Sequence, residues 1–468
     1  MRDDSPVTRI GIIGGGPGGY EAALVARQLG ADVTLVDSDG LGGSAVLTDC
    51  VPSKTLIAVA EVLDEVNDSR VLGVRLPGSA GVELDLVDGR VKSLARAQSD
   101  DVAAHLADDV VEVIVGRGRL ETVRRGGIHQ IAVARSDGET QRLDVDVALV
   151  ATGAHPRLLP GAAPDGERIL TWTQVYDLTE LPERLIVVGS GVTGAEFASA
   201  YQAFGSQVTL VSSRERVLPG EDVDAAVVLE DVFKRRGMTV LSRTRAQAAR
   251  RVGEGVEVTL GDGSTISGSH VLMAVGSVPN TEDIGLTAAA VRADDRGFIV
   301  TDRVSRTSAA GTYAAGDCTG VLMLASVAAM QGRIAMKHAL GDAVAPLDLK
   351  VVASNVFTDP EIATVGCTQR QVDDGEVNAA SVKLALDTNA RAKMQGITDG
   401  FVKLFCRPGT GIVVGGVVVA PRASELIFPV SLAVRHGLTV DQVADAFTIY
   451  PSLSGSVAEA ARKLHRPH

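Results

Sequence analysis

Residues 9–19 read RIGIIGGGPGG, and this stretch decides the fold class. A short apolar strand runs into Gly14, Gly16 and Gly19, spaced G-x-G-x-x-G, and the helix-prone sequence YEAALVA follows. That order is typical of a dinucleotide-binding βαβ unit. The first glycine permits a tight turn, the second lets the backbone approach a diphosphate, and the third lets helix and strand pack closely. The diphosphate is then held by the helix N-terminus, whose free N–H groups and dipole favour anions.

A second copy of this pattern lies at residues 184–194, which read RLIVVGSGVTG and precede the helical AEFASA. Its three glycines are Gly189, Gly191 and Gly194. A single glycine pattern is weak evidence, because glycine-rich turns are common. Two copies, each between a strand and a helix, indicate two βαβ units and therefore two bound dinucleotides.

The strand that completes each unit is followed by a different residue. It reads DVTLV in the first copy and QVTLV in the second, and 18 residues after the last glycine stand Asp37 and Ser212. An acid here binds a ribose hydroxyl of the dinucleotide. Ser212 is instead followed by Arg214 and Arg216, which can pair with the 2′-phosphate of NADP. We therefore expect NADPH to be accepted and preferred, with NADH also usable; two solvated surface arginines are the alternative.

The rest of the chain divides around these units. Residues 147–153 (VALVATG) and 271–276 (VLMAVG) are similar strand–turn segments, which we expect to carry the chain from one dinucleotide domain to the other. An apolar strand ends in GD at residue 317, and an alanine-rich helix follows over 323–340. Beyond residue 347 no glycine fingerprint recurs, which indicates an α+β domain. We predict strands there at 351–357, 363–366, 401–406 and 412–419, and helices at 422–436, 440–447 and 455–464.

Composition excludes several classes of function. The net charge of −13 argues against a nucleic-acid partner, which needs a basic face. No stretch reaches the roughly 18 apolar residues of a membrane span, and the acidic N-terminus does not resemble a signal peptide. The four cysteines are scattered, with neither a disulfide framework nor a zinc spacing. We expect two to four domains in the 468 residues and a cytoplasmic location.

Taken together, the motifs resemble those of the FAD-dependent pyridine nucleotide–disulfide oxidoreductases, the group of lipoamide dehydrogenase, glutathione reductase and soluble transhydrogenase. The likeness runs from about residue 8 to about residue 464. Besides the two fingerprints it is carried by GG at 42–43, CVPSK at 50–54, ATG at 151–153, AGD at 315–317, TDPE at 358–361 and YPSL at 450–453.

The resemblance implies an α/β fold with two Rossmann-like domains and a C-terminal α+β dimerisation domain. The FAD domain would comprise residues 1–154 and 278–346, the NAD(P) domain residues 155–277, and the dimerisation domain residues 347–468. A homodimer would complete each active site with residues of the partner.

The same resemblance implies roles for individual residues. Lys54 would lie beside the N5 edge of the flavin, paired with Glu196, where a cation stabilises negative charge on reduced flavin. Asp37 would bind the adenosine ribose of FAD, and Asp317 the ribityl chain. The candidate catalytic residues are Lys54, Glu196 and Tyr450. The candidate cofactor-binding residues are Gly14, Gly16, Gly19, Asp37, Gly43, Lys54, Thr152, Gly153, Asp317, Ala325, Gly189, Gly191, Gly194, Ser212, Arg214, Arg216 and Gly276.

The chain departs from the family where the dithiol chemistry belongs. Cys50 occupies the flavin-proximal cysteine position, but the partner position is Ala45, which cannot supply the second thiolate of an exchange. The family's C-terminal His-Pro…Glu motif has become Tyr450 and Gly455. Tyrosine titrates near about pH 10 and is a poor proton shuttle at neutral pH. Cys50 is then either a lone redox thiol or an inert, small buried residue.

Without an exchange thiol, electrons must leave the flavin directly. We expect an NAD(P)H:quinone oxidoreductase of the diaphorase type, with a quinone reaching the flavin through the space left at Ala45, Tyr450 and Gly455. One alternative is a soluble transhydrogenase, since the family's transhydrogenases also lack an intact cysteine pair and carry an arginine-bearing loop. The other is a non-catalytic flavin and NAD(P) redox sensor.

Overall fold

The structure is a computed structural model of the 468-residue chain, and it describes residues 7–78, 80–124 and 126–465. The chain forms two compact units. The first comprises Met1–Ser53, Gly89–Arg157 and Ser277–Asp348, and the second Lys54–Asp88, Leu158–Gly276 and Leu349–His468.

A five-stranded, wholly parallel sheet forms the centre of the first unit. Its strand order is β18-β7-β1-β2-β3, the arrangement of a doubly wound dinucleotide-binding domain. The strands are β1 (Arg9–Ile13), β2 (Asp32–Asp37), β3 (Glu112–Val115), β7 (Val147–Val150) and β18 (Thr312–Ala314). The predicted strands around residues 9–13, 32–36 and 147–150 are confirmed.

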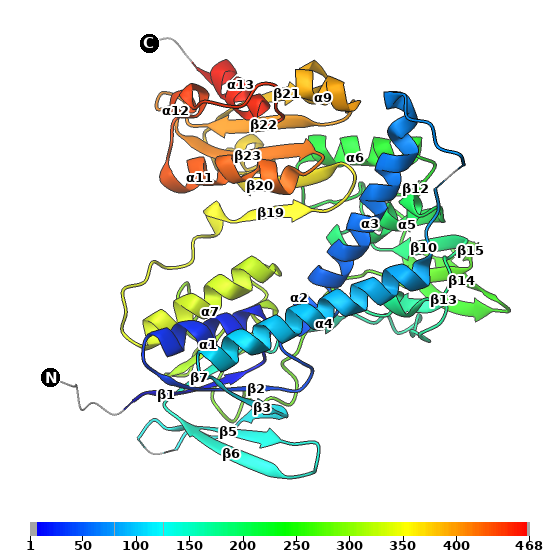
Figure 1. Cartoon of the computed structure of the whole chain (residues 1–468). Helices are drawn as coiled ribbons and strands as arrows, with labels where there is room; N and C mark the ends of the chain where they lie inside the picture. The colour runs from blue at the N-terminus through cyan, green and yellow to red at the C-terminus, as the bar shows by residue number, and fades with distance from the viewer. Residues whose placement is uncertain (1–6, 79, 125, 466–468) are drawn as a thin grey trace. The chain divides into compact units, whose positions relative to one another are not determined.

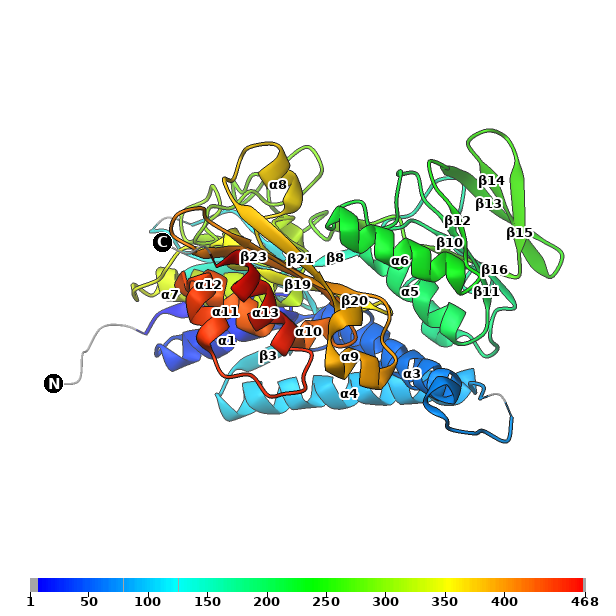
Figure 2. The ribbon, with the colours of Figure 1, turned by 90° about the horizontal axis from the view of Figure 1, so that it is seen from above.

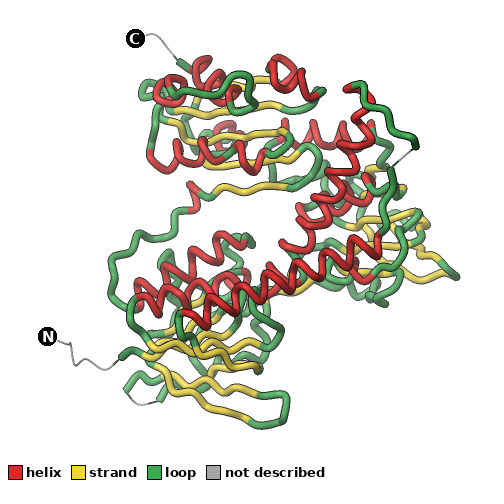
Figure 3. The backbone as a smooth tube through the Cα atoms, viewed as in Figure 1, coloured by secondary structure: helices red, strands yellow, loops and turns green. Residues whose placement is uncertain are grey.

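Each face of this sheet is covered by a different layer. Helices α1 (Pro17–Gln28) and α7 (Ala325–Ala339) lie side by side on one face with the C-terminal part of α4 (Leu84–Asp108), and their buried side chains form one core with the strands (Figures 1 and 3). The other face carries an antiparallel sheet. Its strands are β4 (Arg117–Leu120), β5 (His129–Ala134) and β6 (Thr140–Val145). The strands β8 (Ala154–Pro156) and β17 (Ser277–Pro279) pair antiparallel at the end of the unit.

Two helices, α3 (Cys50–Asp68) and α4, cross a boundary between the two units along the chain. Helix α2 (Gly43–Leu47) follows the first βαβ unit, and α3 begins in the first unit and continues into the second, which starts at Lys54. The sequence reasoning did not predict α4, although it is 25 residues long.

The second unit contains another five-stranded parallel sheet, with the order β12-β11-β10-β16-β9. Its strands are β9 (Ile169–Thr171), β10 (Arg184–Val188), β11 (Gln207–Val211), β12 (Thr239–Leu241) and β16 (His270–Met273). The accompanying helices are α5 (Val192–Ala203) and α6 (Val223–Arg235), and the separate antiparallel sheet is β13 (Ala246–Val252), β14 (Gly255–Leu260) and β15 (Thr265–Gly268). The internal repeat seen in the sequence is therefore a repeat of structure.

A second sheet in this unit, of order β19-β20-β23-β22-β21, is antiparallel throughout. It is built from β19 (Ala353–Val356), β20 (Glu361–Gly366), β21 (Ala380–Ala385), β22 (Phe401–Cys406) and β23 (Val413–Ala420). The helices α11 (Phe428–His436) and α13 (Gly455–Leu464) cover one face of it, because their buried residues share one core with alternate strand residues such as Val402 and Leu404 (Figure 2).

The short helices of this part are α8 (Gln369–Asp373), α9 (Ala390–Gln395), α10 (Ala423–Leu426) and α12 (Val440–Asp445). The predicted α+β character is thus confirmed, and β21 is an additional strand. The two sheets of the second unit each have a core of their own. The division of the chain into four segments, with boundaries near residues 154, 277 and 346, stays a prediction.

Candidate functional site

The carboxyl edge of the parallel sheet in the first unit brings together residues that are far apart in sequence. Gly14 follows β1, Asp37 ends β2, Thr152 follows β7, and Asp317 follows β18. Because all these strands run parallel, their ends meet at one edge, where open α/β sheets bind ligands. Four of the predicted FAD-binding residues therefore lie along one edge.

The three glycines of the first fingerprint have different surroundings. A Cβ on Gly14, whose φ is +105°, would lie 2.3 Å from the carbonyl oxygen of Ala151, and one on Gly19 would lie 1.9 Å from the carbonyl oxygen of Gly14. On Gly16, however, the nearest atom would be 4.0 Å away, the Cα of Gly43. The outer glycines are thus required by backbone packing, and the middle glycine leaves open space at the start of α1.

The N-terminus of α1 is suited to an anion. Pro17 begins the helix, and no side chain among the described residues caps it. Pro17 has no N–H, and the N–H groups of Gly19 and Tyr20 donate to the carbonyl oxygen of Gly16, so the attraction for a phosphate here comes chiefly from the positive end of the helix dipole. Ala325, another of the predicted cofactor-binding residues, is the first residue of α7 in the same unit.

Asp37 shapes the loop that surrounds this space. Its Oδ2 accepts a hydrogen bond of 2.7 Å from the N–H of Gly15, and its Oδ1 accepts bonds from the N–H groups of Asp39 (2.8 Å) and Gly40 (2.6 Å). The carboxylate thus holds the turn after β2 against the glycine loop. It also borders a cavity of about 470 Å³ that includes Gly14 and Thr152.

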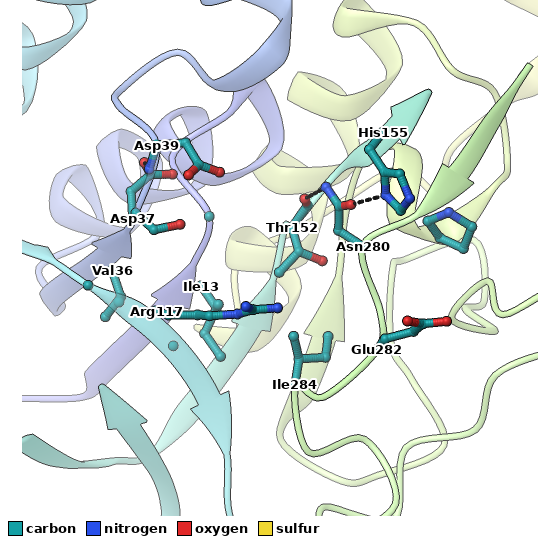
Figure 4. Close-up of a pocket in the computed structure, with 15 residues that line it drawn as sticks. Ile13, Val36, Asp37, Asp39, Arg117, Thr152, His155, Asn280, Glu282 and Ile284 are labelled. Atoms are coloured by element: carbon teal, nitrogen blue, oxygen red, sulfur yellow. Dashed lines mark hydrogen bonds between the residues drawn. The ribbon is translucent and has the colours of Figure 1, made fainter. Parts of the chain in front are cut away.

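Other residues of this cavity were not found by the sequence reasoning. Figure 4 shows Arg117 extending into the cavity below Thr152, while Asn280, His155 and Glu282 lie on the opposite side. Asn280 donates to the carbonyl oxygen of Thr152 at 2.8 Å and bonds to Nδ1 of His155 at 2.6 Å. The sequence does carry a signal for this pair. The two similar strand–turn segments end at residues 153 and 276, and a proline stands three residues after the final glycine of each. His155 precedes the first of these prolines, and Asn280 follows the second.

Asp317 has an environment unlike that of Asp37. Burial, with a smaller effect of the nearby Asp49, raises the pKa of Asp317 to about 6. Gly316, which precedes Asp317, donates its N–H to Oε1 of the buried Gln331 at 2.8 Å. A desolvated carboxyl of this kind gains from a hydroxyl donor, and a ribityl chain offers such donors. The residues of this edge therefore fit a flavin adenine dinucleotide.

The second fingerprint repeats this arrangement in the second unit. A Cβ on Gly189 (φ +110°) would lie 2.1 Å from the carbonyl oxygen of Ala274, and one on Gly194 would lie 1.9 Å from that of Gly189. A Cβ on Gly191 would meet nothing within 4 Å, and no described side chain caps α5. Ser212 and Gly276 follow β11 and β16 at the same edge. The edge is thus built for a second dinucleotide.

Lys54 and Glu196 form an ion pair, as the resemblance implied. Lys54 Nζ lies 2.7 Å from Glu196 Oε2, and the carboxylate is 4% exposed because α5 is buried along most of its length. The other oxygen of Glu196 accepts the N–H of Phe357 at 2.9 Å, and the Lys54 ammonium lies 5.0 Å from the centre of the Phe357 ring. The lysine head is therefore fixed in position and remains 31% exposed.

Tyr450 lies on a solvent-exposed segment of the described chain. Its side chain is 86% exposed, with Phe447 at 107% and Ile449 at 80%. Large apolar side chains are seldom exposed in such a run.

The segment expected to carry the dithiol contains one cysteine. Ala45 lies in α2, and Cys50 is the first residue of α3. No disulfide joins any of the four cysteines, all of which the structure describes.

Two dinucleotide-binding edges and a fixed lysine–glutamate pair define the class of protein as a flavin- and nicotinamide-dependent oxidoreductase. Comparison with known families agrees: residues 8–332 match the pyridine nucleotide-disulphide oxidoreductase family, and residues 352–461 match the dimerisation domain of that family. The chain belongs to the pyridine nucleotide-disulphide oxidoreductases.

Individual relatives cover almost the whole chain. An NAD(P)H dehydrogenase (quinone) of Mycobacterium tuberculosis is 55% identical over 98% of this chain and 94% of its own length. A dihydrolipoyl dehydrogenase of Chlorobaculum tepidum is 35% identical over 97% and 96%. Among solved structures, LpdA of Mycobacterium tuberculosis has a TM-score of 0.95 at 54% identity and covers 98% of this chain and 100% of its own.

None of the helices within residues 7–78, 80–124 and 126–465 combines the length and the apolar composition of a membrane span.

Proposed function

We propose that this protein is an FAD-dependent NAD(P)H dehydrogenase that reduces quinones without a dithiol–disulfide step. The observation that carries the proposal is the pairing of two complete dinucleotide edges with a redox segment that holds one thiol, Cys50, and Ala45 in place of the second. The relative that is 55% identical and bears the name NAD(P)H dehydrogenase (quinone) supports this proposal. When bound, FAD supplies the two-electron chemistry between nicotinamide and acceptor.

The chain's own residues would serve to bind, orient and balance charge. In the first unit, Asp37, Thr152 and Asp317 would hold FAD, together with the N-terminus of α1. In the second, Gly191 and the N-terminus of α5 would hold the diphosphate of the nicotinamide nucleotide. Lys54, paired with Glu196 at 2.7 Å, would stabilise negative charge that develops on the reduced cofactor.

The residues at the usual relay positions argue against a disulfide as the acceptor. A disulfide substrate needs a thiolate to attack it and a second thiolate to release it. It also needs a proton shuttle, and Tyr450 and Gly455 stand where the family has histidine and glutamate. A quinone needs neither thiol, because it accepts electrons directly from a flavin.

We propose that NADPH is preferred over NADH. Ser212 carries no charge to repel a 2′-phosphate, and Arg214 and Arg216 lie on the loop that follows it. NADH would still bind through the contacts that both nucleotides share.

We further propose a homodimer and a cytoplasmic location. The match to a dimerisation domain over residues 352–461 and the exposed apolar side chains of Phe447, Ile449 and Tyr450 support the homodimer. The scattered cysteines, which form no disulfide, suit a reducing compartment. The four-segment division of the chain belongs to the same proposal.

The test is an acceptor screen on purified, FAD-loaded enzyme. With NADPH under anaerobic conditions the flavin absorption should bleach, and a menadione-type quinone should restore it with steady turnover. Lipoamide and glutathione disulfide should give no turnover above background. Efficient turnover of either disulfide would refute the proposal, hydride transfer to an NAD analogue faster than to quinone would favour a transhydrogenase, and binding without bleaching would indicate a sensor.

A further inference from the structure

The loop after β11 runs alongside the turn after β12 and is bonded to it. The N–H of Arg243 donates to the carbonyl oxygen of Arg214 at 2.7 Å, and the N–H of Thr244 donates to that of Ser212 at 2.8 Å. Arg243 has φ of 53°, in the left-handed region that non-glycine residues rarely adopt, and these two bonds hold the turn in that conformation. A third arginine is thereby fixed beside Arg214 and Arg216.

Ser212 does not present its hydroxyl to this surface. The residue is fully buried, and its Oγ lies 2.6 Å from Oγ of Ser190 and accepts the N–H of Arg214 at 3.1 Å. The serine therefore shapes the loop from inside. Recognition of an anion at this edge falls to the exposed arginine side chains.

Glu215 lies between two of those arginines. Its Oε1 is 3.1 Å from Nη2 of Arg243 and 3.8 Å from Nη2 of Arg216. The Glu215 side chain is 62% exposed and that of Arg243 is 74% exposed. Ion pairs this exposed are weak and easily exchanged. A phosphate monoester, with a charge of about −1.5 to −2 and three acceptor oxygens, is a stronger partner for guanidinium groups than one carboxylate.

We propose that Arg243 is a third ligand of the 2′-phosphate of NADPH, and that Glu215 is a competing anion which the phosphate displaces. Arg214 and Arg216 attract the phosphate, Arg243 completes the cluster from the neighbouring turn, and Glu215 limits the preference for NADPH over NADH. This inference rests on the proposed use of NADPH, and it assigns the strength of the preference for NADPH over NADH to Arg243 and Glu215.

The test measures the affinity of the FAD-loaded enzyme for 2′,5′-ADP and for 5′-ADP, which lacks the 2′-phosphate, by titration calorimetry. We expect Arg243→Ala to weaken 2′,5′-ADP about tenfold and 5′-ADP less than twofold. Glu215→Gln should strengthen 2′,5′-ADP several-fold. Arg245→Ala is the matched control, because Arg245 is an exposed arginine just after the same turn. Its carbonyl oxygen accepts the N–H of Gly261, which follows β14. The Arg245→Ala variant should change neither affinity.

The possible results separate the inference from the function on which it rests. Equal loss of both ligands in Arg243→Ala, or a 2′,5′-ADP affinity within twofold of wild type, overturns the role of Arg243. Weaker binding of 2′,5′-ADP in Glu215→Gln overturns the role of Glu215. If the wild-type enzyme binds 2′,5′-ADP no more tightly than 5′-ADP, both the inference and the NADPH preference are wrong. Wild-type quinone turnover with NADH reports on the proposed function independently of all these outcomes.

Discussion

Replacing Glu196 by glutamine should separate the structural from the chemical role of the lysine pair. Coulomb's law at the 2.7 Å between Lys54 Nζ and Glu196 Oε2 gives a gross attraction of about 6 kcal/mol at an effective dielectric constant of about 20. Burying the carboxylate offsets part of it. Removing one partner of such a pair costs about 3–5 kcal/mol, and since Lys54 is 31% exposed we expect the low end, about 3 kcal/mol.

The assay is urea unfolding of the FAD-loaded enzyme, combined with stopped-flow reduction of the flavin by NADPH. Glu196→Gln should lower the urea midpoint at an unchanged slope. Lys54→Met should slow flavin reduction by about 10²–10³-fold, because it removes the cation that would stabilise the reduced cofactor. The double variant should regain stability to within about 1 kcal/mol of wild type, since no buried charge is left without a partner.

Two results would refute this reasoning. If Glu196→Gln unfolds at the wild-type midpoint, the ion pair does not stabilise the fold. If the double variant reduces its flavin at the wild-type rate, Lys54 has no chemical role, and the pair is structural only.

Three further outcomes are expected. Lys403→Met should lower the free energy of unfolding by about 3–5 kcal/mol, which guanidinium unfolding measures. Lys403, 3% exposed, lies 2.8 Å from the buried Asp222 carboxylate, and its loss leaves that charge uncompensated. Burial raises the pKa of Asp64 to about 6, so the stability that its protonated form contributes is full below about pH 4 and is lost as pH rises through 6. Asp64→Asn should therefore flatten the plot of unfolding free energy against pH over that window, and an unaltered plot would contradict this reasoning. Gly191→Ala should weaken NADPH binding at an unchanged melting temperature, because the added Cβ would meet no protein atom within 4 Å. Gly194→Ala should lower the melting temperature, because the added Cβ would lie 1.9 Å from the carbonyl oxygen of Gly189.

The fold was predictable from sequence because its repeating part is local. A fingerprint needs only a strand, three glycines and a helix within about 30 residues, and both copies form the predicted strands. The antiparallel strands 401–406 and 412–419 were also legible from their Val/Phe runs, and the structure places them at Phe401–Cys406 and Val413–Ala420.

What the sequence did not indicate depends on contacts between distant segments. Helix α4 has a weak apolar face, and its buried Val102 and Leu106 are explained only by the sheet they cover. Asn280 reaches Thr152 across 128 residues, and Arg243 reaches the loop of Arg214 through backbone bonds that no side-chain pattern reports. The sequence shows which residues are charged, but it does not show which residue each charged side chain contacts.

The two dinucleotide edges share one backbone frame but differ in charge where the second strand of each ends. In the first, Asp37 ends the second strand and accepts a hydrogen bond from the N–H of Gly15, one residue after the first fingerprint glycine. In the second, Ser212 stands at the equivalent position and bonds back to Ser190, again one residue after the first glycine. The bond between turn and glycine loop is kept while the negative charge is lost. Because Ser212 still holds the loop without a carboxylate, the proposed recognition of the 2′-phosphate can rest on the exposed arginines, where we expect substitutions to alter affinity without disturbing the sheet.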